Sequence, residues 1–194
     1  MYHDLLDKGY AALRRGDVEA ALRHFQRATE EAPERPQAYF ALAQAYLEQG
    51  SGEHTRRSLE AALKADPGYA QARAFLGIEL LKQYDVHGAE DALDQALKDE
   101  PTNLLVHIKY AEYYYRLGFY HRAVTMLEEG LHKPHGANEH VVALARKLLT
   151  QARQHTKNTI IREPPDPRAW LHLFARLCKG RALQTSNRAV AEQQ

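Results

Sequence analysis

The spacing of three prolines constrains this chain more than any other feature of the sequence. Pro33, Pro67 and Pro101 lie 34 residues apart, and other residue types recur with the same period. The recurring positions are Gly16, Gly50, Tyr84 and Gly118; Ala21, Thr55, Ala89 and Ala123; Phe25, Leu59, Leu93 and Leu127; and Ala28, Ala62, Ala96 and Gly130. A period of this length predicts an array of small stacked units, because one such unit cannot bury its apolar face alone.

Each copy of the repeat predicts two α-helices. In the second copy, Tyr39, Leu42, Ala43 and Tyr46 share one face of a helix of period 3.6, and Gly50 ends it. We expect first helices at 2–15, 36–49, 70–83 and 104–117, and second helices at 18–31, 52–65, 86–99 and 120–132. In the first copy, Asp17 stands where its carboxylate can cap the second helix. No run of alternating β-branched residues competes with the helical pattern.

Small residues recur where the two helices of a pair must approach closely. On the first helices these are Gly9, Ala43, Gly77 and Ala111, and on the second helices Ala21, Ala89 and Ala123. Small residues beside large ones let antiparallel helices interlock. Ala62 and Ala96 occupy similar contact positions, so we expect no room there for a larger side chain.

These residues resemble the tetratricopeptide repeat family. The signature is strongest in Gly16-Asp17, Ala21, Phe25, Ala28 and Pro33 of the first copy, and in Tyr39, Leu42, Ala43, Tyr46, Gly50, Ala62 and Pro67 of the second. The resemblance covers residues 2 to about 135, and it departs from the pattern at Lys8, Tyr84 and Pro134. It implies an all-α, right-handed α-solenoid of four repeats within 1–135, at about 2–35, 36–69, 70–103 and 104–137, followed by C-terminal capping helices.

The pattern fades after the fourth repeat. A capping helix is predicted at 138–155, with Val141, Leu144, Ala145 and Leu148 on one face and Arg146, Lys147 and Arg153 on its exposed side. A proline-containing linker at 156–166 precedes an amphipathic helix at 167–184, which carries Trp170, Leu173, Phe174 and Leu177 at helical spacing. Residues 185–194 are expected to form a polar tail.

The resemblance also implies a binding surface, because first helices line the concave face of a tetratricopeptide array. Successive positions along that face form rungs, and the predicted peptide-binding groove consists of Leu6, Tyr10, Phe40, Gln44, Ala74, Ile78, Ile108, Glu112 and Tyr115. We expect Phe40 and Ile108 to be exposed when no partner is bound. Chaperone-binding members hold a carboxylate with lysines and asparagines, but here the corresponding residues are Leu6, Tyr10, Ala41, Gln71 and Phe75. The groove therefore suits an amphipathic helix or a peptide with bulky apolar side chains.

No motif in the sequence indicates catalysis. Phosphate-binding, nucleophile-elbow and zinc-protease motifs are missing, and Cys178 has no identifiable activating partner. His132, His135 and His140 have only Glu139 as a nearby carboxylate, so neither a metal site nor a cofactor is expected. With a mean hydropathy of -0.59, no long apolar run, no secretory signal and one cysteine, we expect a cytoplasmic protein without a membrane-spanning segment.

Charge is distributed unevenly along the chain and leaves alternatives open. Residues 140–194 carry 10 Lys and Arg against 3 Asp and Glu, whereas residues 1–139 carry 16 against 22. The leading interpretation is a non-enzymatic scaffold or adaptor that binds a protein or peptide partner in the groove. The alternatives are a structural protein that self-assembles through the 167–184 helix, and a basic-tailed subunit of a nucleic-acid-associated complex, although the basic residues do not cluster on one motif.

Overall fold

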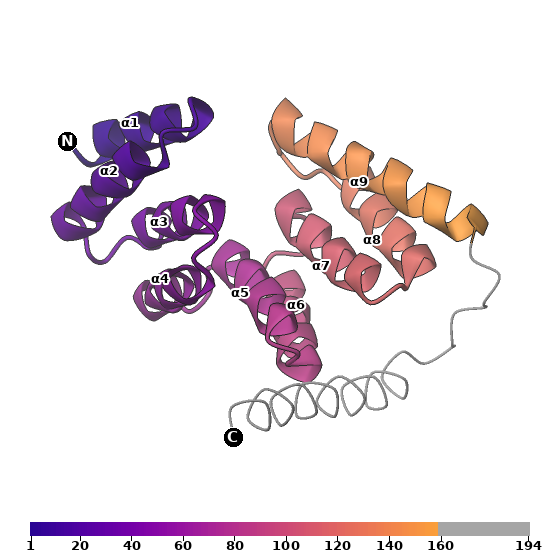
Figure 1. The fold of residues 1–194 in the computed structure, drawn as a ribbon. Coiled ribbons are helices and arrows are strands. Elements are labelled where there is room, and N and C mark those ends of the chain that lie inside the picture. Colours follow the sequence, from indigo (N-terminus) through magenta and orange to yellow (C-terminus); the bar gives the residue numbers. More distant parts are fainter. Residues whose placement is uncertain (159–194) are drawn as a thin grey trace, which may run out of the picture. The chain divides into compact units, whose positions relative to one another are not determined.

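Residues 1–158 of the chain are described by a computed structural model and are helical throughout, with no strand among them. The helices are α1 (Tyr2–Arg14), α2 (Val18–Glu31), α3 (Pro36–Glu48), α4 (Gly52–Ala65), α5 (Ala70–Lys82), α6 (Val86–Asp99), α7 (Leu104–Arg116), α8 (Tyr120–His132) and α9 (Glu139–Asn158) (Figure 1). Each repeat helix begins and ends within one residue of its predicted bounds. The all-α prediction is therefore confirmed for this part of the chain.

After the fourth repeat, the observed structure agrees less closely with the prediction from the sequence. Helix α9 continues to Asn158, so residues 156–158, which we expected in the linker, are helical. Nothing in their sequence ends a helix, because the first proline comes only at Pro164. The rest of the predicted linker, the 167–184 helix and the 185–194 tail lie outside the described residues.

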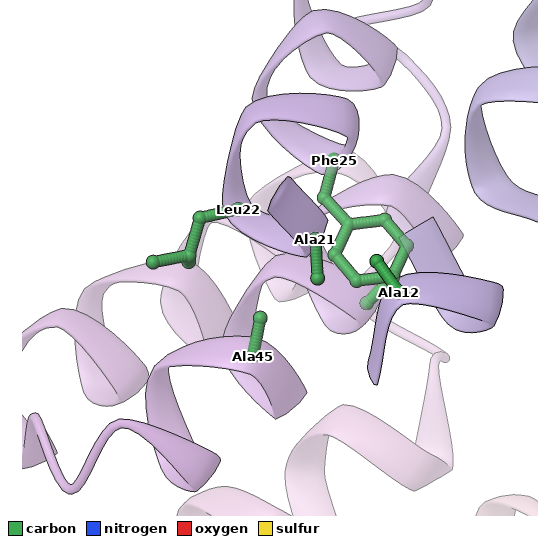
Figure 2. Packing of buried hydrophobic residues seen from close by; sticks show 6 residues of the cluster. Ala12, Ala21, Leu22, Phe25 and Ala45 are labelled. Carbon is green, nitrogen blue, oxygen red and sulfur yellow. The ribbon is translucent and has the colours of Figure 1, made fainter. Parts of the chain in front are cut away.

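The chain divides into two compact units, and the boundary passes through the third repeat. The first unit contains residues 1–79 and 92–101. In it α1 packs on α2, α2 on α3, and α3 on α4. Its core includes Phe25, which is fully buried with Ala12 and Ala21, and Figure 2 shows the Phe25 ring lying against Ala12. Small residues thus admit the large ring between the helices, as the repeat pattern predicts.

The second unit contains residues 80–91 and, within the described chain, residues 102–158. Helices α7, α8 and α9 pack on one another there. His107 of α7 is fully buried, and its Nδ1 lies 3.2 Å from the Met126 carbonyl oxygen of α8. An added Cβ at Gly130 would lie 2.7 Å from the His107 Cβ, so α7 and α8 meet at a residue without a side chain.

The turn between the two helices of each repeat has the same hydrogen-bond pattern. After α3, the Gly50 amide donates to Leu47 and the Ser51 amide donates to Tyr46, which is the Schellman arrangement. Gly16, Gly50 and Gly118 reach it with φ of 78°, 78° and 85°, and Tyr84 takes the equivalent position in the third repeat with φ 63°. The repeat therefore imposes a left-handed backbone even where the sequence has no glycine.

Side-chain caps begin two of the helices, of which the Asp17 cap was predicted and the Asn103 cap was not. Asp17 accepts a hydrogen bond from the Ala20 amide at 2.9 Å and so caps α2. Asn103 does the same for α7 through the Leu105 amide, also at 2.9 Å. Each cap satisfies one of the amides that the first turn of a helix leaves without an intrahelical partner.

Candidate functional site

Two predicted groove residues in the first unit satisfy each other. The Tyr10 hydroxyl of α1 donates a hydrogen bond to Gln44 Oε1 of α3 at 3.2 Å, and the Tyr10 ring packs edge-on against Phe25 with centroids 5.1 Å apart. Burial raises the pKa of Tyr10 to about 12. Leu6, on the neighbouring rung, is half-buried against the core. Leu6, Tyr10 and Gln44 are each partly exposed, so their place in the groove stays a prediction.

Four other groove residues are buried, with exposures of 4% for Phe40, 0% for Ala74, 4% for Ile78 and 3% for Ile108. The expectation that Phe40 and Ile108 are exposed is therefore wrong. Phe40 packs edge-on against Phe75 and Tyr69, with ring centroids 5.1 and 5.5 Å away. The neighbouring repeat covers the Phe40 side chain, so Phe40 belongs to the core and not to an open surface.

The second unit contains a hollow of about 510 Å³ between α7 and α9. Three of the predicted groove residues, Ile108, Glu112 and Tyr115, line it from α7. The other lining residues are Lys109 and Arg116 on α7 and Leu144, Lys147, Leu148 and Gln151 on α9. The structure thus brings together the fourth-repeat residues of the predicted groove and opposes them with the capping helix.

Leu144 is the most exposed apolar residue of this hollow. Its relative exposure is 45%, whereas Ile108 opposite is nearly covered. Large apolar side chains left in water are characteristic of contact surfaces when several lie together. Leu144 is the exposed member of the apolar floor of the hollow, which the partly buried Leu148 and the buried Ile108 complete.

A carboxylate lies on the α7 side of the hollow between two cations. Glu112 pairs with Lys109 Nζ at 2.9 Å and with an Arg116 guanidinium nitrogen at 2.7 Å. Burial raises the pKa of Glu112, but these two cations lower it further, so the net shift is downward. Glu112 is therefore ionised at neutral pH, and both cations that pair with its carboxylate belong to α7.

Aromatic contacts hold the end of α9 beside this hollow. The His155 ring stacks on Tyr120 of α8 at 4.8 Å and meets Tyr115 edge-on at 5.5 Å. Arg153 of α9 also pairs with Glu128 of α8 at 2.7 Å. These contacts fix α9 against α7 and α8, so the hollow is set by the fold and does not depend on a bound partner.

Sequence reasoning missed the α9 side of the site because the register changes after the fourth repeat. Leu144, Leu148 and Gln151 lie 36 residues after Ile108, Glu112 and Tyr115, not 34. Lys147 is exposed, as predicted, and it also lines the hollow, which the sequence did not indicate. The residues around Pro134 lengthen the connection to α9, and this was the available signal for a shifted register.

Family models of the tetratricopeptide repeat match residues 6–53 and 80–148. The chain belongs to the tetratricopeptide repeat family. Its fold is an all-α helical-repeat solenoid, and repeats of this family generally mediate protein–protein interaction. No curated protein matches the sequence.

Solved structures show the same fold. The chain resembles a thermophilic tetratricopeptide repeat protein of Thermus thermophilus with a TM-score of 0.65 at 20% identity, covering 95% of this chain and 100% of that one. It resembles a chain of the Cut9–Hcn1 hetero-tetramer of APC/C with a TM-score of 0.67 at 17% identity, covering 80% of this chain but only 32% of that one. The first repeat domain of Spaghetti, bound to an HSP90 peptide, matches with a TM-score of 0.54 at 17% identity, covering 60% and 94%.

Other kinds of site find no support in residues 1–158. This range contains no group of three or more histidine, cysteine, aspartate or glutamate side chains placed to hold a metal ion. No helix within it has the length and apolar character needed to cross a membrane. Cys178 and Trp170 lie outside the described residues.

Proposed function

We propose that this tetratricopeptide repeat protein is a non-enzymatic scaffold or adaptor that binds a peptide or an amphipathic helix of another protein. The observation that carries the proposal is the preformed hollow between α7 and α9, whose apolar floor includes the exposed Leu144. Of the nine predicted groove residues, we retain Ile108, Glu112 and Tyr115 as the binding positions. The driving force is burial of an apolar partner side chain on this floor.

The proposal is tested by selecting a random peptide library, displayed on phage, against the full chain. We expect peptides to be enriched that bind the wild type and lose binding to Leu144→Gln, because this change makes the floor polar at nearly constant size. Ala143→Gln is the matched control, since Ala143 is an exposed neighbour on α9 that does not line the hollow.

Fluorescence anisotropy of the labelled peptides measures the affinities, and circular dichroism confirms that both variants keep the helicity of the wild type. Peptides that bind Leu144→Gln as well as the wild type would place the binding surface elsewhere. A selection without enrichment would contradict peptide binding by this chain.

A further inference from the structure

We infer that the segment bound in the hollow is acidic, with aspartate or glutamate residues flanking a bulky apolar anchor. This inference rests on the proposed function and names the chemistry of the partner. It follows from the combination of an apolar floor with a rim of net positive charge, which the α7 and α9 side chains create together.

The apolar floor of the hollow determines which kind of partner side chain can serve as the anchor. Ile108, Leu144 and Leu148 offer no charged group at the base of the hollow, and its volume of about 510 Å³ accommodates a large aliphatic or aromatic side chain. A polyanion such as RNA would meet the same cations at the rim, but its phosphates would gain nothing from this apolar surface. The floor therefore favours a peptide over a nucleic acid.

The charged residues around the hollow determine which charge the bound segment carries on either side of its apolar anchor. Lys109, Arg116 and Lys147 stand around the hollow, and Glu112 is the only carboxylate among the lining residues. Glu112 already pairs with Lys109 and Arg116, whereas Lys147 makes no ion pair within residues 1–158. Three cations against one carboxylate leave an excess of positive charge, which attracts carboxylates and repels a basic segment.

The C-terminal part of this chain is a poor occupant by the same criterion. Residues 159–194 carry six Lys and Arg against three Asp and Glu. Their apolar residues Trp170 and Phe174 could serve as anchors, but the surrounding charge has the sign of the rim. A partner of opposite charge is therefore favoured over this segment.

The test compares charge reversals at two adjacent positions of α9 in the full chain. Lys147→Glu changes the rim, while Arg146→Glu introduces the same charge on an exposed neighbour that does not line the hollow. The probes are a Leu144-dependent peptide from the library selection and its counterpart with every aspartate and glutamate replaced by lysine. Anisotropy gives the dissociation constants at low and high salt.

We expect the selected peptides to be rich in Asp and Glu around a Leu, Phe or Trp. Lys147→Glu should raise the dissociation constant of the acidic probe roughly tenfold. The charge reversal removes one attraction and adds one repulsion, and each has about the energy of an exposed ion pair. Arg146→Glu should change this dissociation constant by less than about twofold, since the charge of residue 146 lies away from the hollow. The lysine counterpart should bind the Lys147→Glu variant more tightly than it binds the wild type. High salt should weaken the binding of the acidic probe to the wild type.

Leu144-dependent peptides without acidic residues would overturn this inference and leave the proposed function intact. Equal responses of the two charge reversals would also overturn it. A single-stranded oligonucleotide that binds in competition with the peptides and depends on Lys147 would assign the rim to nucleic acid. Tryptophan emission tests whether the C-terminal segment itself occupies the hollow, because Trp170 is the only tryptophan of the sequence. A red shift of the emission in Leu144→Gln, without one in Ala143→Gln, would show that it does and would overturn the inference.

Discussion

Phe25 lies directly on the backbone of Gly9. A Cβ added at Gly9 would come within 2.3 Å of the Phe25 Cε1 atom, far inside van der Waals contact, and the ring is itself fully buried. Helices α1 and α2 therefore meet at a residue that has no side chain, and the ring fills the space that a side chain would need.

This contact predicts that Gly9→Ala destabilises the protein by about 1–3 kcal/mol through overpacking, despite the better helix propensity of alanine. Gly52→Ala is the control, because its Cβ would meet only Glu79 Oε2 at 3.5 Å. That variant should be neutral or up to about 1 kcal/mol more stable. Urea unfolding followed by circular dichroism measures both, and an equal effect of the two changes would contradict the tight contact.

The left-handed Tyr84 predicts a stabilising substitution. Tyr84→Gly should raise the free energy of unfolding by up to about 1 kcal/mol, because a left-handed residue other than glycine costs about 1–2 kcal/mol and glycine recovers part of this. Tyr84 is 53% exposed, so little packing is lost. The reverse change Gly50→Tyr should destabilise. A less stable Tyr84→Gly variant in thermal unfolding would show that the phenol contributes more than its backbone costs.

Full burial of Ala62 supports the predicted lack of space at that position. Ala62→Leu should therefore lower the free energy of unfolding by about 1–3 kcal/mol. Lys64→Leu, on the exposed side of the same helix, should change it by no more than about 0.5 kcal/mol. Urea unfolding distinguishes the two, and an unchanged midpoint for Ala62→Leu would contradict the packing of α4.

The burial of Phe40 changes what its substitution should do. Phe40→Ala should destabilise by about 3–5 kcal/mol, because it leaves a cavity against Phe75 and Tyr69. Peptide capture by the folded protein should be retained, since Phe40 does not line the hollow. Loss of capture with an unchanged melting temperature would instead restore Phe40 to the binding surface.

The ion pairs of Glu112 predict a dependence of stability on pH. Because the pKa of Glu112 is lowered from 4.5 in the folded state, its stabilising contribution is complete above that value and is lost as the pH falls through the lower folded pKa. The difference in melting temperature between wild type and Glu112→Gln should therefore be constant near neutral pH and shrink once the pH falls below 4.5, the ordinary pKa from which that of Glu112 is lowered. A difference that grows in acid would contradict the sign of the shift.

Much of the fold could be predicted because its signals are local. The 34-residue period, the glycines at the turns and Asp17 at the start of α2 act over a few residues, so they locate the helices without knowledge of their neighbours. Close contacts such as Gly9 with Phe25 follow from the same period, since each repeat packs its two helices in the same way.

The site could be predicted only in part, because it depends on which neighbour covers each side chain. The period places Phe40 and Ile108 at equivalent positions, yet aromatic rings cover Phe40 whereas Ile108 lies at the base of a hollow. The sequence by itself determined the repeat and the helices, and it named Ile108, Glu112 and Tyr115 of α7 as candidate binding residues. Only the tertiary structure decided that Leu144 and Lys147 oppose them, because the position of α9 depends on a lengthened connection and on packing against α7 and α8.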